Sequence, residues 1–165
     1  MEHRFLLADD SASARHMVRQ ILASREEWHI CAEASDGDGA IEKALATSPE
    51  LVIMDISMPR LNGIEAARRI LEDCPHTPVL MISAFDPGPY LSYLFKIGIC
   101  GFVRKDTVDT DLVPAIEALL RGQHYLRPTQ HWLSLADCAL GDRLAGPHRD
   151  LAGDPVAAVA PRLAR

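Results

Sequence analysis

The sequence has few aromatic residues, few cysteines and no long apolar run, and each shortage excludes a class of protein. Phe, Trp and Tyr make up 5% of the 165 residues, and the four cysteines are far apart with no C-x-x-C pair. This spacing favours core thiols over a disulfide framework or a zinc site. No apolar run approaches the roughly 20 residues that cross a bilayer, and no secretory signal is recognisable. We therefore expect a soluble cytoplasmic protein that does not enter the membrane. The cysteines are Cys31, Cys74, Cys100 and Cys138.

Positive charge is also in short supply. The sequence has 17 Lys and Arg against 23 Asp and Glu, which gives a formal net charge of -6. Because nucleic-acid-binding proteins usually carry a basic patch or stripe, we expect no direct nucleic-acid binding by this chain. With 48% hydrophobic residues, the chain can bury one proper core and still leave a short additional segment.

Short apolar runs alternate with amphipathic segments from residue 4 to about residue 122. This alternation is typical of β-α-β units and predicts an α/β fold with a parallel sheet of five strands and five helices. The strands are expected at residues 5–8, 29–34, 51–54, 79–82 and 101–104. The first helix is expected to start near Ser11, capped by Asp10 or Ser11.

Two details of the helices can be checked directly. The apolar face of the first helix should include Met17, and that of the second should include Leu45. The last helix should be capped by Thr110 or Asp111, which would place Pro114 in its first turn, where proline is tolerated.

The composition changes after residue 126. Residues 127–165 are rich in Ala, Pro, Gly and Arg, although a short helix could begin at residues 132–135. We expect residues 1–126 to form one domain and residues 127–165 to form a partly helical or disordered tail. A helix-turn-helix domain needs several amphipathic helices, and we expect no complete one in this tail. Asp86 to Pro89 should be a loop or a helix start.

Five polar residues stand at the ends of the predicted strands or directly after them: Asp9, Asp10, Asp55, Ser83 and Lys105. In an open parallel sheet the carboxyl ends of the strands share one edge, and ligands bind there. Residues almost a hundred positions apart are therefore expected to converge. Three carboxylates, one hydroxyl and one ammonium suit a divalent cation and a phosphoryl group.

A carboxylate such as Asp55 can act as a nucleophile and form an acyl phosphate. Phosphoryl transfer needs in-line positioning and neutralisation of the equatorial oxygens. Mg²⁺, or Mn²⁺ in its place, takes an octahedral shell of oxygen ligands. We expect Asp10 and Asp55 to bind the ion directly and Asp9 to bind it through water. The backbone carbonyl of Ser57 is within reach of the same ion.

The other two polar residues can contact the phosphoryl group itself. Lys105 can pair with a phosphoryl oxygen as a point charge, and the Ser83 hydroxyl can donate to another. The contact of Ser83 exists only after phosphorylation, so this residue can report the modified state.

Four stretches of the sequence resemble the receiver domain of two-component response regulators, over residues 3–124: LLADDSASAR, VIMDISMPRLNGIEAARRI, VLMISA and GICGFVRKD. The likeness is to CheY-like receivers. The spacing of Gly98, Gly101 and Lys105, followed by LLRGQHYLRP, is similar to the NarL/FixJ (LuxR-type) subgroup, which normally carries a C-terminal helix-turn-helix domain. The resemblance implies a flavodoxin-like, doubly wound sheet with strand order 2-1-3-4-5.

The resemblance also implies a role for each candidate residue. Asp55 would be the phosphoacceptor, Asp9 and Asp10 the acidic pair, and Lys105 the lysine of the site; Ser83 and Phe102 would be the switch residues. A histidine kinase would supply the phosphoryl group. The surface of the fourth helix, fifth strand and fifth helix would then change and control transcription or a protein partner. Homodimerisation on phosphorylation is implied as well.

Other functions have to be weighed against this one. A stand-alone receiver would act only through protein contacts. A phosphatase with an Asp nucleophile would want a second Asp where Ser57 stands, and a flavodoxin-like cofactor binder would want a phosphate loop where Asp9 and Asp10 stand. We therefore expect a phosphoacceptor rather than a true enzyme, with self-catalysed phosphotransfer and autodephosphorylation at most.

Overall fold

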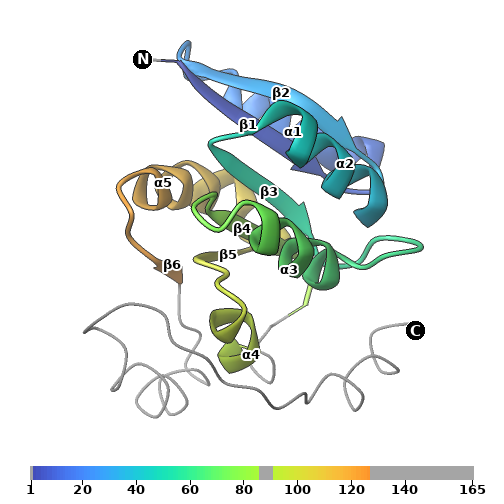
Figure 1. Cartoon of the computed structure of the whole chain (residues 1–165). Helices are drawn as coiled ribbons and strands as arrows, with labels where there is room; N and C mark the ends of the chain where they lie inside the picture. Colours follow the sequence, from blue (N-terminus) through green and yellow to red (C-terminus); the bar gives the residue numbers. More distant parts are fainter. Residues whose placement is uncertain (1, 86–90, 127–165) are drawn as a thin grey trace. The chain divides into compact units, whose positions relative to one another are not determined.

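A computed structural model describes residues 2–85 and 91–126. All strands of its single sheet run parallel, in the order β2-β1-β3-β4-β5-β6 (Figure 1). The strands are β1 (His3–Ala8), β2 (Trp28–Ala34), β3 (Leu51–Asp55), β4 (Val79–Ser83), β5 (Gly101–Arg104) and β6 (Tyr125–Leu126). The helices are α1 (Ala12–Leu22), α2 (Gly37–Thr47), α3 (Gly63–Asp73), α4 (Leu91–Lys96) and α5 (Val108–Leu120). A short 3-10 helix, η2 (Lys105–Thr107), precedes α5.

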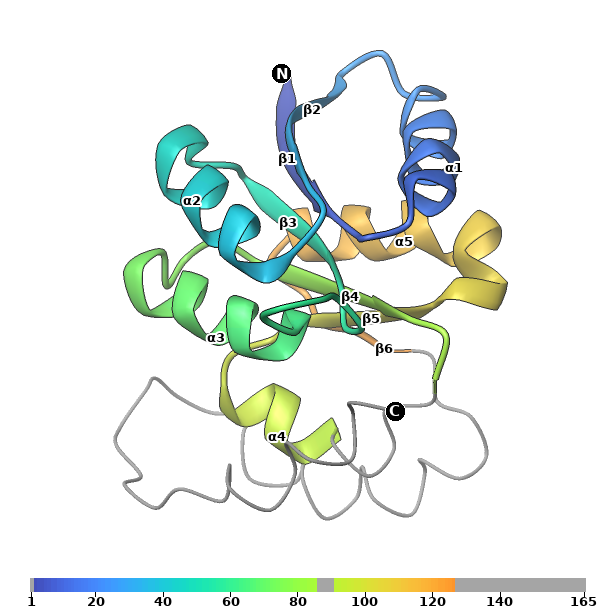
Figure 2. The same cartoon turned by 90° about the vertical axis from the view of Figure 1, so that its right-hand side faces the viewer.

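The helices cover both faces of the sheet. Figure 2 shows α1 and α5 on one face, and α2, α3 and α4 on the other. Alternate residues of the inner strands point to the α1 and α5 side, because successive side chains of a strand face opposite ways. There they form one buried core with the apolar faces of the two helices; its members include Phe5, Leu7, Ile53, Val18, Leu22, Leu112 and Ile116.

The predicted fold class and the strand order 2-1-3-4-5 are confirmed. The sixth strand was not expected. It contains only two residues, which pair with Gly101 and Phe102 at the edge of β5. A segment this short has no periodicity that a sequence pattern could register.

Three predictions about the helices were wrong in detail. Met17 and Leu45 are 43% and 48% exposed, so they lie outside the core that the apolar pattern assigned them to. The last helix begins at Val108, which puts Pro114 well inside it rather than in the first turn. Thr110 and Asp111 do not cap it.

The reason lies in side-chain hydrogen bonds within the start of α5. The Thr110 hydroxyl donates to the Thr107 carbonyl at 3.0 Å, and the Thr107 hydroxyl donates to the Asp111 carboxylate at 2.9 Å. Residues that usually cap helices can bond back to the preceding turn in this way. By contrast, Ser11 caps α1 as predicted, with its hydroxyl accepting from the Ala14 amide at 3.3 Å.

Cys31, Cys74 and Cys100 are free thiols that are half-buried rather than fully in the core. Predictions for Cys138, for residues 86–89 and for residues 127–165 lie outside the described residues. Among the residues that the structure describes, no helix has the length and apolarity needed to cross a membrane.

Candidate functional site

The register of the sheet brings the predicted polar residues to one edge. Ala8 is the partner of Met54, so the residues that follow, Asp9 and Asp55, leave neighbouring strands at the same level. Asp55 is in turn level with Ile82 of β4, and Ser83 is level with Arg104 of β5. The ends of four strands therefore line up to within about one residue.

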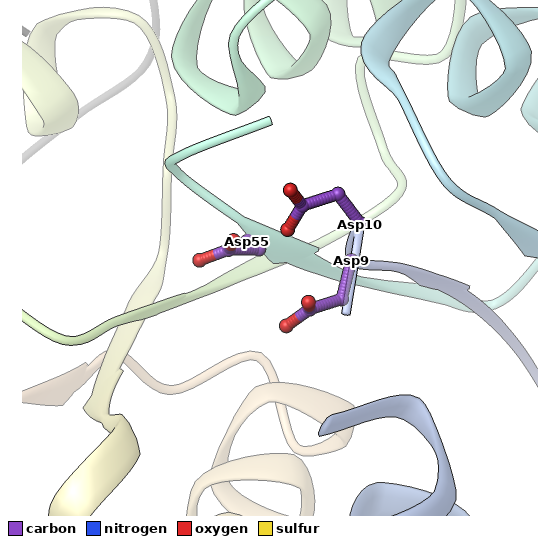
Figure 3. A group of neighbouring side chains, drawn as sticks. All are labelled: Asp9, Asp10 and Asp55. Atoms are coloured by element: carbon purple, nitrogen blue, oxygen red, sulfur yellow. The ribbon is translucent and has the colours of Figure 1, made fainter. Parts of the chain in front are cut away.

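Three carboxylates meet at this edge. Carboxylate oxygens of Asp9, Asp10 and Asp55 all lie within 4.8 Å of one another. Figure 3 shows the three side chains extending from the ends of β1 and β3 toward the same space. Asp9 and Asp55 are buried, with 4% and 3% of their surface exposed, whereas Asp10 faces solvent. The cluster thus has a closed inner side and an open outer side.

Lys105, the first residue of η2, joins two of these carboxylates. Its Nζ lies 2.8 Å from Oδ2 of Asp9 and 3.2 Å from Oδ2 of Asp55. Asp106, the next residue, pairs with Arg104 instead. Lys105 therefore points into the acidic cluster and does not form an exposed pair with its neighbour.

The charges of the cluster shift the titration of two groups. Burial raises the pKa of the Asp55 carboxyl, and the charge of Asp9 adds to this effect; Lys105 and the Ser57 amide oppose it without cancelling it. Burial lowers the pKa of Lys105, but its contacts with Asp9 and Asp55 outweigh that effect and raise the pKa overall. One ammonium for three carboxylates thus leaves Asp55 under-compensated, and an added cation would favour its ionised form.

Ser83 stands at this edge of the sheet but its hydroxyl is bonded elsewhere, and Phe102 lies further from the edge on β5. Ser83 is 2% exposed, and its Oγ accepts a hydrogen bond from the Phe85 amide at 3.0 Å. Phe102 is 3% exposed on β5, three residues before Lys105. The structure therefore brings the carboxylates and Lys105 together directly, with Ser83 at the end of the next strand and Phe102 further down β5.

The loop between β3 and α3 supplies the last predicted residue. Ser57 is exposed on this loop, two residues after Asp55. The loop turns back tightly: the Gly63 amide donates to the Ile56 carbonyl at 2.9 Å, and the Asn62 side chain caps α3 by accepting from the Glu65 amide at 2.9 Å. Ser57 is thus held between two anchored segments.

Sequence reasoning missed the residues that support this edge. Arg60 of the same loop pairs with Asp36, which caps α2 by accepting from the Gly39 amide at 2.8 Å. Arg15 of α1 donates to the backbone carbonyl of Asp9 at 2.7 Å. The pair of Arg60 with Asp36 has no local signature, because its partners come from segments that only the fold brings together. Arg15 and Asp9 are six residues apart across the turn from β1 to α1, and this spacing alone does not indicate their contact. The positive φ of Arg60, 64°, is likewise invisible in the sequence.

A comparison with family models decides the affiliation of the chain. The model described as the response regulator receiver domain matches residues 5–117. The chain belongs to this family. It is thus the receiver domain of a two-component response regulator, a type that normally acts as a phosphoacceptor switch.

Curated relatives of this receiver are of the same kind. The transcriptional regulatory protein YxjL of Bacillus subtilis is 35% identical over 124 residues, which cover 75% of this chain and 57% of YxjL. DegU of Brevibacillus brevis is 31% identical over 125 residues, covering 76% of this chain and 53% of DegU. The receiver chain therefore spans about half the length of the curated relatives it matches.

A solved structure supports the same affiliation. The LuxR-family two-component response regulator from Aurantimonas sp. SI85-9A1 superposes with a TM-score of 0.74 at 28% identity, over 88% of this chain and all of that one. The expected resemblance to LuxR-type response regulators is thus confirmed at the level of the receiver domain.

Receiver domains bind Mg²⁺ at an acidic pocket, and the residues of this chain fit that ion. Asp9, Asp10 and Asp55 offer hard oxygen ligands, of which Mg²⁺ typically takes one or two from protein carboxylates together with waters. The negative balance of the cluster around Lys105 provides the electrostatic attraction.

Proposed function

We propose that this receiver is a switch that accepts a phosphoryl group on Asp55 from a histidine kinase. The observation that supports it most is the convergence of Lys105 and Asp10 on the Asp55 carboxylate, within a chain that matches the receiver family. An Asp55 oxygen forms a bond to phosphorus as the bond between phosphorus and the kinase histidine nitrogen breaks. The histidine leaves with the electron pair of that bond.

Each neighbouring residue has a proposed role in this transfer. Asp10 and Asp55 would hold Mg²⁺ directly, Asp9 would act through water, and the Ser57 carbonyl would be a further oxygen ligand. When bound, the ion neutralises charge on the phosphoryl oxygens. Lys105 Nζ exchanges its contact with the Asp55 carboxylate for one with a phosphoryl oxygen. Ser83 turns its hydroxyl from the Phe85 amide toward another phosphoryl oxygen.

We propose that the signal is transmitted to a partner by the surface formed by α4, β5 and α5. Movement of Ser83 and Phe102 changes this surface, which then controls transcription or a protein partner. We propose that residues 1–126 form the receiver domain and residues 127–165 a tail without a complete DNA-binding domain. We also propose that this receiver forms a homodimer on phosphorylation.

The central test is phosphorylation of the full chain by acetyl phosphate, followed by intact mass. We expect the mass of one phosphoryl group to be gained with Mg²⁺ or Mn²⁺ and none with EDTA. Asp10→Asn should raise the Mg²⁺ concentration needed for half-maximal phosphorylation by more than about tenfold, because it removes a direct ligand. Asp73→Asn, an exposed aspartate at the end of α3, is the matched control and should behave like the wild type. Equal phosphorylation in EDTA would contradict the proposal.

Lys105→Ala separates the chemistry from the conformational response. The variant should still be phosphorylated on Asp55, because the nucleophile and the proposed metal ligands remain. It should respond less, because no ammonium pulls η2 toward the phosphoryl oxygens. The measurement is the solution mass, by light scattering with Mg²⁺, before and after beryllofluoride. A Lys105→Ala variant that dimerises like the wild type would remove Lys105 from the switch.

A further inference from the structure

The edge of β5 is covered by the end of the domain itself. Strand β6 pairs with β5 through Tyr125 and Leu126, and the Tyr125 amide donates to the Cys100 carbonyl at 3.0 Å. In Figure 2, β6 lies next to β5 at the border of the sheet. An open strand edge would offer unpaired backbone groups to another chain. Here two residues of the same chain occupy that edge.

The side chains around β6 contact both the core and α4. Tyr125 packs against the core on the α1 and α5 side. The ring of His124 makes an edge contact with Phe95 of α4, with centroids 5.9 Å apart. Leu126 borders a gap of about 10 Å³ with Phe102 and three residues of α4: Leu91, Leu94 and Phe95. The gap has room for about one water molecule at most, and the half-buried Leu126 lies in this apolar seat.

This seat is connected through β5 to the strand that carries Ser83. Phe102 is the register partner both of Leu126 on β6 and of Met81 on β4, two residues before Ser83. A shift of Ser83 would therefore reach Leu126 through β4 and Phe102.

We propose that the α4–β5 edge is an interaction surface whose occupant, the segment His124–Leu126, is displaced when Asp55 is phosphorylated. The inference rests on the proposed phosphorylation and goes beyond it. The seat of Leu126 fits the arrangement in which Lys105 contacts Asp55 and Ser83 accepts from Phe85. Phosphorylation exchanges both contacts, and a two-residue strand has little pairing energy to resist the change. Release of β6 frees the β5 edge.

Leu126→Ala in the full chain tests this coupling. If the phosphorylated state must break the Leu126 seat, removing the side chain should favour that state by the same factor, because coupling is reciprocal. We expect Leu126→Ala to bind beryllofluoride, with Mg²⁺, about fivefold more tightly than the wild type. Leu45→Ala removes an exposed leucine from α2 and is the matched control. Binding can be followed by fluorine NMR, and folding by circular dichroism.

A second readout follows the strand itself. In the wild type, the Tyr125 amide should exchange with solvent about fivefold faster when beryllofluoride is bound. Unchanged affinity in Leu126→Ala, together with unchanged Tyr125 exchange in a wild type that binds beryllofluoride, would overturn the coupling alone. A wild type that binds no beryllofluoride would overturn the proposed function and the coupling together.

Discussion

Asp55→Asn is expected to abolish phosphorylation by acetyl phosphate while leaving the fold intact. The amide has nearly the shape of the carboxylate but lacks the charged oxygen that attacks phosphorus. No other carboxylate of the cluster replaces it in the proposed reaction, because Asp10 and Asp9 are assigned to the metal ion. The measurement is the intact mass of the variant after incubation with acetyl phosphate and Mg²⁺.

The stability of this variant separates a chemical effect from a structural one. Burial and Asp9 raise the pKa of Asp55, so the ionised carboxylate lowers the free energy of unfolding. An asparagine removes that charge and its repulsion with Asp9, although it also loses the ion pair with Lys105. Because the raised pKa shows that the unfavourable contributions dominate, we expect a melting temperature no lower than that of the wild type.

Two further variants make the assignment specific. Asp111→Asn changes an aspartate that is as buried as Asp55, with 3% of its surface exposed, and should still be phosphorylated normally. Asp55→Glu keeps the carboxylate but displaces it by one methylene, so phosphorylation should fall about 100-fold through misplacement alone. A phosphoprotein in Asp55→Asn that persists with Mg²⁺ would refute Asp55 as the acceptor.

The sequence was sufficient for the sheet because each inner strand is a continuous apolar run that ends in a polar residue. In a parallel sheet the edge at which those polar residues meet follows from topology alone. For this reason the convergence of Asp9, Asp10, Asp55 and Lys105 could be anticipated without any contact being known. Their roles as phosphoacceptor, metal ligands and phosphate contact remain predictions.

The features that escaped prediction depend on contacts between distant segments or lie in very short segments. Strand β6 has two residues and exists because the edge of β5 is available to pair with. The pair of Arg60 with Asp36 joins the β3–α3 loop to α2. The start of α5 depends on hydrogen bonds between Thr107, Thr110 and Asp111, where capping propensity and back-bonding compete. Propensity alone cannot rank those alternatives.

Gly63→Ala is expected to have the largest effect on stability. A Cβ at residue 63 would lie 1.9 Å from the Asp55 carbonyl oxygen and 3.0 Å from Cγ of Met54. The first contact is with backbone at the end of β3, so it cannot be relieved by a side-chain rotation. Either α3 or the end of β3 must move. We expect a loss of about 3 kcal/mol or more in the free energy of unfolding, measured by urea denaturation.

The same clash should also lower the rate of phosphorylation, because the displaced atom belongs to Asp55. A shift of about 1 Å in a reacting group can cost roughly 100-fold in rate, so the surviving folded fraction should be phosphorylated far more slowly than the wild type. Gly39→Ala in α2 is the control: its Cβ would meet Asp36 and Ala34 at 3.4 and 3.8 Å, in ordinary contact. Alanine is favoured over glycine inside a helix by about 0.5–1 kcal/mol, so this variant should be as stable as the wild type or slightly more so. If both alanine variants behaved alike, the tight approach of α3 to β3 would not be what positions Asp55.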